Sequence, residues 1–489
     1  MNDELAQLEP RSVWGQFANI ARIPRPSKHE HQVSAYVRAE ATRLGLVVHA
    51  DRVGNLVVDV PATPGREHAP VVILQGHLDM VGEKNKEVDH DFLKDPIRPR
   101  LGGEWVTATG TTLGADNGIG VAAALAVAAD REVEHGPLQL LFTIDEETGL
   151  TGAKELDASL LRGKTLLNLD SEEDAVLFVG CAGGKDSHLS LAPRREVPPG
   201  GLSPFLLEVG GLRGGHSGLN IVENRGNALK LAARILDAAR TQGIPFRLTS
   251  VLGGSKHNAI PREAEARLYA DPATRSALEG VVACMSEAFR GELEGIDEGL
   301  QTRVGPCSGA PGARVLSTED RDRLLDLLLA LPHGVLAMSP AIPGLVETSN
   351  NLAVVREEGE RILIVTSSRS SVMPTLDAVA GSVGAAGRLA GAKVEIHDGY
   401  PGWKPNVGSP VLAVVREVYR RQWGQEPKVT AIHAGLECGL LGQKVPGLDM
   451  ISFGPQIEGA HSPDERVHVP SVQRFWKALC AVLVALSGN

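Results

Sequence analysis

The chain has 489 residues, of which 43% are hydrophobic and 22% are charged, so it is long enough for two or more domains with sizeable cores. Its formal net charge of -11 argues against sequence-independent binding to nucleic acid, which requires a basic surface. The five cysteines are scattered and include no Cys-x-x-Cys pair, which argues against a disulfide framework or a cysteine-ligated metal site and favours a reducing compartment.

The first ten residues contain neither a basic start nor an apolar stretch, so we expect no secretory signal. An apolar run at residues 121–129 is too short to span a bilayer, and no run of like charges suggests a membrane-surface helix. We therefore expect a soluble, cytoplasmic protein that does not associate with membranes.

The first part of the chain alternates between helical and extended patterns. Apolar spacing predicts helices at residues 12–22, 34–44 and 118–129, and strands at residues 71–75, 138–144 and 166–169. This alternation predicts an α/β fold with a mostly parallel sheet between helices. In such sheets ligands gather beyond the carboxyl ends of the strands, and polar motifs follow all three strands.

From about residue 184 the pattern changes to half-exposed strands and amphipathic helices. We predict strands at 187–191, 204–209, 246–252, 263–269, 351–355 and 361–367, and helices at 224–242, 280–291, 319–331 and 376–389. This pattern predicts an inserted α+β domain, and its second strand–helix set suggests a duplicated unit. The alternation of helices and strands seen in the first part of the chain then resumes, with a helix at 410–423 and strands at 428–432 and 449–452.

These changes predict three segments in two domains. Residues 1–184 and 401–489 would form a discontinuous catalytic, metal-binding domain, and residues 185–400 a lid and dimerisation domain. The polar loop containing His461 lies in the last segment, so the chain would leave the first domain and return to it.

His77 and Asp79 follow the strand at 71–75 and are two residues apart, which places them on the same side of an extended segment. His77 could ligate a metal while Asp79 orients its imidazole. The plainer interpretation is a surface histidine near a turn, and His-x-Asp alone does not decide between the two.

Asp116 lies between glycines before a predicted helix, where an aspartate often serves only as a cap. The adjacent carboxylates of residues 145–147 repel one another unless they are solvated or bind cations. A solvated helix start would explain them, but beside a metal Glu147 could ligate and Glu146 could act as a general base.

Asp170 ends another strand and His461 lies in a polar loop; each alone would be a turn residue or a surface histidine. Together the motifs offer two imidazoles and several carboxylates, which suits borderline metals such as zinc. There are enough groups for two metal ions and one spare base, which is what a two-metal hydrolase requires.

The sequence resembles the M20 metallopeptidases, and within them the bacterial aminoacyl-histidine dipeptidases, also called peptidase D or Xaa-His dipeptidases. The likeness covers nearly the whole chain. It is carried by residues 20–27 (IARIPRPS), 75–81 (QGHLDMV), 113–120 (LGADNGIG), 145–149 (DEETG), 180–184 (GCAGG), 214–218 (GGHSG) and 433–439 (HAGLECG).

The resemblance implies two zinc ions per subunit, with manganese or cobalt as possible substitutes. It implies that Asp116 bridges the two ions, that His77 and Asp170 complete one site, and that Glu147 and His461 complete the other. Glu146 would then be the general base, and Asp79 the partner that orients His77.

The resemblance also implies functional residues in the middle region. His216 would be an additional donor to the reacting carbonyl oxygen, within one chain or across a subunit boundary. Asn258 and the backbone of Gly435 would contact the substrate, and Arg369 would clamp its terminal carboxylate, for which a bidentate guanidinium is suited. Without the resemblance, these would be turn or surface residues.

We therefore predict a dizinc dipeptidase that releases C-terminal histidine from small Xaa-His dipeptides and forms a homodimer. Another M20-type amidohydrolase, a tripeptidase or N-acyl amino acid deacylase, remains an alternative, because only contacts in the lid would distinguish it. A metal-binding interaction protein without catalysis is the third possibility, but such a protein would not need Glu146 as a base.

Overall fold

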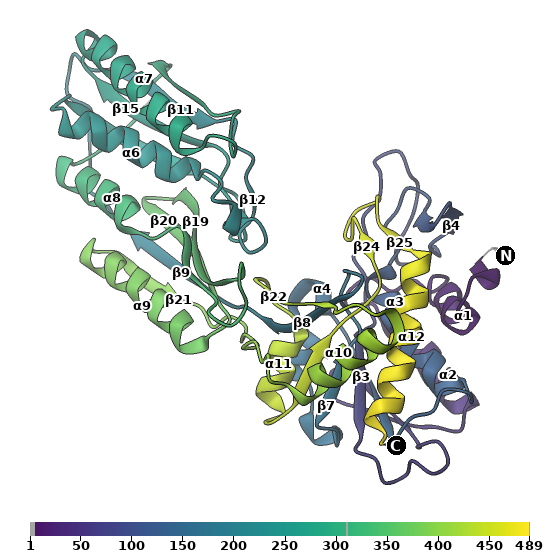
Figure 1. The fold of residues 1–489 in the computed structure, drawn as a ribbon. Helices are drawn as coiled ribbons and strands as arrows, with labels where there is room; N and C mark the ends of the chain where they lie inside the picture. The colour runs from purple at the N-terminus through teal and green to yellow at the C-terminus, as the bar shows by residue number, and fades with distance from the viewer. Residues whose placement is uncertain (1–4, 310–311, 489) are drawn as a thin grey trace. The chain divides into compact units, whose positions relative to one another are not determined.

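The computed structural model describes residues 5–309 and 312–488, which fold into two compact units (Figure 1). Residues 1–4, part of the segment considered for a secretory signal, lie outside the described residues. Unit 1 comprises Met1–Cys181, Trp403–Ala431 and Leu436–Asn489, and unit 2 comprises Ala182–Gly402 and Ile432–Gly435. The sequence-based boundaries after residues 184 and 400 differ from these by a few residues, and the short return at Ile432–Gly435 was not predicted.

Unit 1 is built on an eight-stranded sheet in the order β1-β2-β6-β3-β7-β23-β8-β22. In that order its strands are Val47–Ala50, Leu56–Val60, Leu138–Thr143, Val72–His77, Thr165–Asn168, Asp449–Ser452, Val176–Cys181 and Lys428–Ile432. The four central strands, from β6 to β23, run parallel, whereas β1–β2, β2–β6 and β23–β8 are antiparallel pairs. The predicted α/β class is confirmed, with antiparallel pairs added outside the parallel centre.

Strands β3 and β6 are buried along their whole length, and β7 and β23 are buried after their first residue, which explains their mostly apolar sequences. The helices of unit 1 are α1 (Arg11–Ile20), α2 (His31–Arg43), α3 (Ala115–Ala129), α4 (Glu146–Gly149), α5 (Thr151–Glu155), α10 (Pro410–Trp423), α11 (Glu437–Lys444) and α12 (Val469–Leu486), with short 3-10 turns η1 (Leu5–Gln7) and η2 (Ala158–Leu160). A small second sheet in the order β24-β25-β5-β4 contains Ile457–Glu458, Arg466–His468, Trp105–Ala108 and Pro99–Gly102. Helix α3 packs against β3, so the start of α3 lies at the edge of the sheet where β3 ends.

Helix α12 was not predicted from the sequence. Within the described residues, it is the one helix whose length and apolar composition would allow it to cross a membrane. Its residues Val472, Phe475, Leu479 and Val482 are nonetheless buried within unit 1, and it packs on α10. A core helix satisfies the same length and composition test, so this finding is weak evidence for a membrane span.

Unit 2 contains a nine-stranded antiparallel sheet in the order β16-β11-β15-β13-β19-β20-β9-β21, with β18 also paired to β19. In chain order these strands are β9 (Gly183–Leu191), β11 (Ser203–Gly210), β13 (Phe246–Gly253), β15 (Ala264–Ala270), β16 (Gln301–Pro306), β18 (Gly334–Met338), β19 (Val346–Glu358), β20 (Arg361–Ser370) and β21 (Lys393–Ile396). The long strand β19 joins the two halves of the sheet, because it pairs with β13 through Gly253 and Val355 and with β20 along its length.

Four helices cover one face of this sheet, in the row α7-α6-α8-α9 (Figure 1). They are α6 (Ala228–Thr241), α7 (Arg275–Glu292), α8 (Thr318–Ala330) and α9 (Met373–Leu389), and their apolar faces form one core with the strands. Smaller elements are the pairs β10 (Arg195–Glu196) with β17 (Val315–Leu316) and β12 (Gly215–His216) with β14 (Ala259–Ile260), and the 3-10 turns η3 (Ile221–Glu223) and η4 (Pro272–Thr274).

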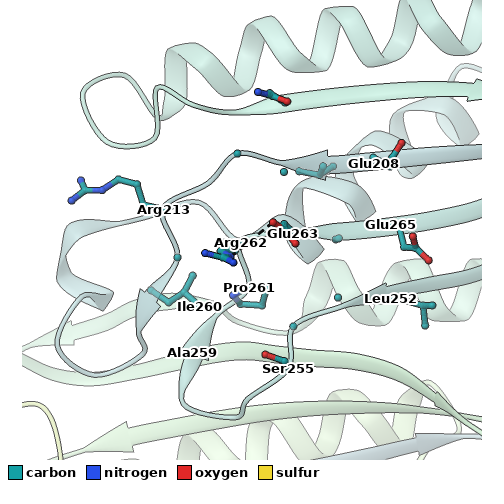
Figure 2. A pocket seen from close by; sticks show the side chains of 18 of the residues that line it. Glu208, Arg213, Leu252, Ser255, Ala259, Ile260, Pro261, Arg262, Glu263 and Glu265 are labelled. Atoms are coloured by element: carbon teal, nitrogen blue, oxygen red, sulfur yellow. Dashed lines mark ion pairs between the residues drawn. The ribbon is translucent and has the colours of Figure 1, made fainter. Parts of the chain in front are cut away.

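Unit 2 also contains an open hollow of about 950 Å³, bordered by the ends of β11, β13, β15 and β16 (Figure 2). Its charged side chains have both signs and pair locally, as Arg303 does with Glu208 and Arg262 with Glu263. None of the metal-ligand candidates lines this hollow.

Candidate metal centre

The seven residues that the sequence singles out all belong to unit 1 and lie at one edge of its sheet. His77 ends β3, Glu146 begins α4 just after β6, and Asp170 follows β7. Because β3 pairs in parallel with both β6 and β7, these three strand ends open onto the same edge.

Asp116 is at the start of α3, and its carboxylate lies between two imidazoles. Its Oδ1 is 3.0 Å from His77 Nε2, and its Oδ2 is 3.1 Å from His461 Nε2. The preceding Gly114 has φ +69°, and an added Cβ there would lie 2.7 Å from the guanidinium of Arg25. Glycine is therefore needed both for the backbone turn and for the close packing beneath Asp116.

Two further carboxylates complete the cluster. Asp170 Oδ1 is 3.3 Å from His77 Nε2, and Glu147 Oε2 is 2.9 Å from His461 Nε2. His77, Asp116 and Asp170 thus converge as one potential ligand set, and Asp116, Glu147 and His461 as a second. Asp116 is the member that both sets share.

Asp79 lies on the other side of the His77 ring, with its Oδ1 3.3 Å from His77 Nδ1. It also accepts hydrogen bonds from the backbone N–H groups of Glu146 and Glu147 and from the Ser27 hydroxyl. Against the effect of burial, the His77 ring and, to a smaller extent, these donors hold the pKa of Asp79 down to about 2. Asp79 therefore links the orientation of His77 to that of the Glu146–Glu147 turn.

The buried carboxylates need positive charge nearby. Burial raises the pKa of Asp170 to about 6 and also raises the pKa of Glu146 well above its usual value, with neighbouring acids adding to the shift of Glu146. Hydrogen bonds to Asp116 and Glu147 raise the pKa of His461 to about 11. The acids thus favour protonated imidazoles in the absence of another cation.

This donor set fits divalent cations. Two imidazole nitrogens and three carboxylates are ligands that zinc accepts, and they are divided into two groups of three that share one bridging group. Glu147 Oε1 is buried and has no hydrogen-bond partner among the described residues, which a cation would provide. Metal binding would displace the imidazole protons.

Arg25 is a structural partner of this site that the sequence did not reveal. Its buried guanidinium donates to the carbonyl oxygens of Leu78, Asp79 and Gly114 at 2.9, 2.6 and 2.5 Å. It therefore ties the His77–Asp79 loop to the Asp116 loop and places a fixed positive charge under the carboxylates. Arg25 lies in the motif at residues 20–27, but nothing in that motif indicates that the arginine binds backbone carbonyl groups.

Glu465 was also missed, and it ties the His461 loop to the Asp116 loop. Its buried carboxylate accepts hydrogen bonds from four consecutive backbone N–H groups, those of residues 113–116, at 2.7, 2.9, 2.7 and 3.3 Å. The only sign of this role in the sequence is that Glu465 follows the candidate ligand His461 by four residues in the same polar loop.

Glu437, at the start of α11, is a third residue that joins separate elements next to the site. It accepts hydrogen bonds from Gln75 Nε2 at 2.5 Å and Thr143 Oγ1 at 2.8 Å, so it joins β3 and β6 just before His77 and Glu146. Burial raises its pKa to about 7.

The remaining four predicted residues lie in unit 2. His216 and Asn258 are held together by the β12–β14 pair, where His216 is opposite Ala259 and Ser217 N–H donates to the Asn258 carbonyl at 2.9 Å. Asn351 Nδ2 donates to the Ala259 carbonyl at 2.8 Å and fixes this loop to β19.

Arg369 and Gly435 meet at Tyr400. Arg369 is buried in β20, and its Nη1 donates to the Tyr400 hydroxyl at 2.6 Å. An added Cβ on Gly435 would lie 2.7 Å from the Tyr400 ring, so a side chain there would displace the tyrosine. His433, two residues earlier, forms a 2.7 Å hydrogen bond between its Nε2 and the hydroxyl of Ser349, which is paired with Arg369 across the sheet.

Comparisons with known proteins match most of the chain to one family. Residues 73–485 match the model of peptidase family M20/M25/M40. The chain is 44% identical to the cytosol non-specific dipeptidase of Escherichia coli (strain K12) over 480 residues, which is 98% of each protein. The chain belongs to the M20/M25/M40 peptidase family.

Solved structures show the same relationship. The aminoacylhistidine dipeptidase of Vibrio alginolyticus matches with a TM-score of 0.92 and 42% identity, covering 99% of this chain and 98% of that one. Aminopeptidase PepT of Bacillus cereus matches with a TM-score of 0.57 and 16% identity over 98% of this chain and 99% of that one, which supports the fold alone.

Proposed function

We propose that this chain is a metal-dependent dipeptidase that binds two metal ions at the edge of the unit 1 sheet and hydrolyses Xaa-His dipeptides. The observation that carries the proposal is the position of Asp116, whose two carboxylate oxygens are 3.0 and 3.1 Å from imidazoles of two separate ligand sets. One shared carboxylate between two sets is the arrangement that a two-metal hydrolase requires.

In this proposal His77, Asp116 and Asp170 hold one ion, and Asp116, Glu147 and His461 hold the other. Zinc is the resident metal that we propose, because the set is mixed imidazole and carboxylate; manganese or cobalt could substitute. Asp79 would fix the His77 ring so that Nε2 faces the metal, as carboxylate partners of ligating histidines do.

When bound, the ions would supply Lewis acidity, which lowers the pKa of water and polarises a carbonyl group. Glu146 is the residue that we assign as general base. It would take a proton from the attacking water and return that proton to the leaving amine. Its raised pKa requires a nearby cation for the carboxylate form to prevail at neutral pH, which two bound metal ions would provide.

His216, Asn258, Arg369 and the backbone of Gly435 are the unit 2 groups that we assign to the substrate. Arg369 would pair with the terminal carboxylate, and the hydrogen bond that its Nη1 donates to the Tyr400 hydroxyl supports a fixed guanidinium orientation. His216 would donate to the developing oxyanion. Unit 2 would then act as the lid and dimerisation domain, and unit 1 as the catalytic domain.

The substrate assignment rests on the relatives. One is named a cytosol non-specific dipeptidase and another an aminoacylhistidine dipeptidase, and both cover almost the whole chain. These names support dipeptides as substrates, with histidine as the second residue, and a cytosolic location. A homodimer is part of the proposal on the basis of family resemblance.

The proposal is tested by hydrolysis of a dipeptide panel with the metal-loaded full-length protein. Xaa-His dipeptides should be cleaved faster than Xaa-Leu dipeptides, tripeptides and N-acetyl amino acids. Preferential cleavage of N-acetyl amino acids or tripeptides would replace the dipeptidase assignment, and hydrolysis that resists chelation would remove the metal mechanism. Light scattering on the same sample measures whether the protein is a dimer.

A further inference from the structure

The His216 side chain sits in a turn whose backbone is fixed on both sides. His216 N–H donates to the Asn220 side chain at 2.9 Å, and the His216 carbonyl accepts from Asn220 N–H at 3.0 Å. On the other side, the β12–β14 pairing holds His216 opposite Ala259. The ring therefore projects from a turn that leaves its own backbone little freedom.

The turn folds back so that two backbone donors point at one ring nitrogen. The N–H groups of Gly218 and Leu219 both donate to His216 Nδ1, at 3.2 and 3.1 Å. A nitrogen that accepts hydrogen bonds from N–H groups cannot itself carry a proton. The proton of a neutral His216 must therefore be on Nε2, the other ring nitrogen.

Gly218 makes this arrangement possible. An added Cβ at this position would lie 2.3 Å from the backbone carbonyl oxygen of His433 and 3.0 Å from His216 Cε1. A residue with a side chain would displace either that carbonyl or the imidazole itself. The turn is thus packed too closely for Nδ1 to exchange its backbone donors for another partner.

The groups around His216 disfavour an added proton. Burial, with smaller effects of the Arg369 guanidinium and of His257, lowers the pKa of His216 to about 4. His257 is itself favoured in its charged form by a 2.9 Å contact between its Nδ1 and Asp186. His433 also faces this group from the returning segment, and burial lowers its pKa to about 3.

We infer that His216 acts as a neutral hydrogen-bond donor through Nε2–H, and that the backbone N–H groups of Gly218 and Leu219 set this tautomer. The inference rests on the proposed function for the identity of the acceptor, the oxygen of the scissile carbonyl. A neutral donor of fixed tautomer needs no reorientation as negative charge develops on that oxygen. It also does not change its charge across the neutral pH range, unlike an ordinary histidine.

The experiment is nitrogen-detected NMR of the full-length, metal-loaded protein with ¹⁵N-labelled histidine, recorded from pH 5.5 to 8. The His216 signals are assigned by their loss in His216→Gln. We expect an unprotonated Nδ1, a protonated Nε2 and no titration in this range. A protonated Nδ1, or a titration midpoint between pH 6 and 7, would overturn the inference.

Leu219→Pro tests the backbone contribution, because proline removes one of the two N–H donors while the exposed leucine side chain makes no contact that the inference uses. Losing one donor should raise the share of the Nδ1–H tautomer about fivefold relative to Nε2–H. Leu219→Ala is the matched control, since it keeps the N–H and should reproduce the wild-type ring signals. An unchanged tautomer ratio in Leu219→Pro would contradict the assigned role of the backbone.

The NMR readout separates this inference from the proposed function. If His216 has the expected tautomer but no dipeptide is cleaved, the proposed function fails and the ring state stands. If dipeptides are cleaved while His216 titrates as an imidazolium, the dipeptidase assignment stands and the neutral-donor inference fails.

Discussion

At the scale of single residues, Glu146 and Glu147 show how adjacent carboxylates acquire different tasks. Glu147 points to His461, with Oε2 2.9 Å from the imidazole, whereas Glu146 lies near the other histidine, with one oxygen within 4.8 Å of a His77 ring nitrogen. Both have backbone N–H groups fixed by Asp79. The turn therefore directs Glu147 into a ligand set and leaves Glu146, the residue before it, available for proton transfer.

Glu146→Gln tests this division of roles. The amide keeps the shape of the side chain but cannot accept a proton, so kcat should fall by roughly 10²–10⁴-fold while both metal ions remain bound. Elemental analysis of the dialysed protein and initial rates with an Xaa-His dipeptide measure the two effects. Glu147→Gln is the comparison, since it should lose metal as well as activity; near-normal turnover in Glu146→Gln would exclude the base assignment.

Glu465→Gln tests a residue that acts only through backbone groups. The amide NH₂ would face backbone N–H groups that now donate to a carboxylate, so the His461 and Asp116 loops should separate. We expect metal affinity to weaken by about 10–100-fold, measured by competition with a chromogenic chelator. Glu458→Gln, at the end of β24 just before this loop and paired with Arg466 at the surface, is the control and should keep wild-type affinity. Equal affinity in both variants would argue against this role.

The sequence brought the seven clustered residues together as candidates because most follow predicted strands and all are of metal-binding type, whereas their individual roles came from the family resemblance. His77, Asp170 and Glu146 follow apolar strands, and parallel pairing brings such ends together. Arg25 and Glu465 were not identifiable in this way. Their partners are backbone carbonyl and N–H groups, which every residue has, so no side-chain pattern marks the contacts.

At the scale of elements, the loop that carries Asn258 is joined to β9 by an ion pair between His257 and Asp186. The contact with His257 lowers the pKa of Asp186 despite burial, and Asp186 raises the pKa of His257 above its usual value of 6.5. The stabilisation from His257 is fully present below pH 6.5 and is lost as pH rises through its folded-state pKa. The stabilisation from Asp186 is present above its unfolded value of 3.8 and is lost as pH falls through its lower folded-state pKa.

The pair should therefore stabilise unit 2 most between about pH 4 and 6.5, by about 0.2–1 kcal/mol because both groups are partly exposed to solvent. Asp186→Asn should remove this contribution and return the His257 pKa toward 6.5, which a histidine NMR titration measures directly. Glu263→Gln, at the surface of the same unit, is the control. A His257 pKa that does not change in Asp186→Asn would show that the ion pair does not form in solution.

The ends of helices and strands depend on contacts that the apolar periodicity of the sequence does not reveal. The helix predicted from residue 224 begins at Ala228, because the Asn227 side chain accepts from Lys230 N–H at 3.2 Å and caps it there. Strands β1 and β16 were missed because none of their residues is fully buried and their sequences lack a clear apolar alternation. Helix α10, in contrast, was predicted at Pro410–Trp423, where Ser409 caps the start and Gly424 follows the end.

At the scale of the whole molecule, the chain passes between the units four times and builds a separate core in each. The core of unit 2 is made by strands and helices between Leu189 and Val394, none of which belongs to the metal centre. The sequence indicated the insertion because His461 returns so late to a site begun by His77. It gave no sign of the return at Ile432–Gly435, since four residues are too few to show a pattern.

Removal of metal should therefore destabilise the two units unequally. All candidate ligands are in unit 1, and a ligand present at 100 times its Kd stabilises the state that binds it by about 2.7 kcal/mol. After chelation, the carboxylates and imidazoles of the cluster must hold protons or repel one another, whereas the unit 2 core keeps all its contacts. Amide hydrogen exchange with and without chelator, resolved by peptide, measures the difference.

We expect faster exchange in the loops at residues 76–80, 113–118, 145–150 and 459–465 after chelation, and unchanged exchange in helices α6 and α8, which serve as internal controls. Adding zinc back should restore protection in proportion to the metal bound. Uniform loss of protection over both units would mean that the molecule unfolds as one body and that the separate cores are not independent. No change in any of the four loops would show that metal does not bind at this edge of the sheet.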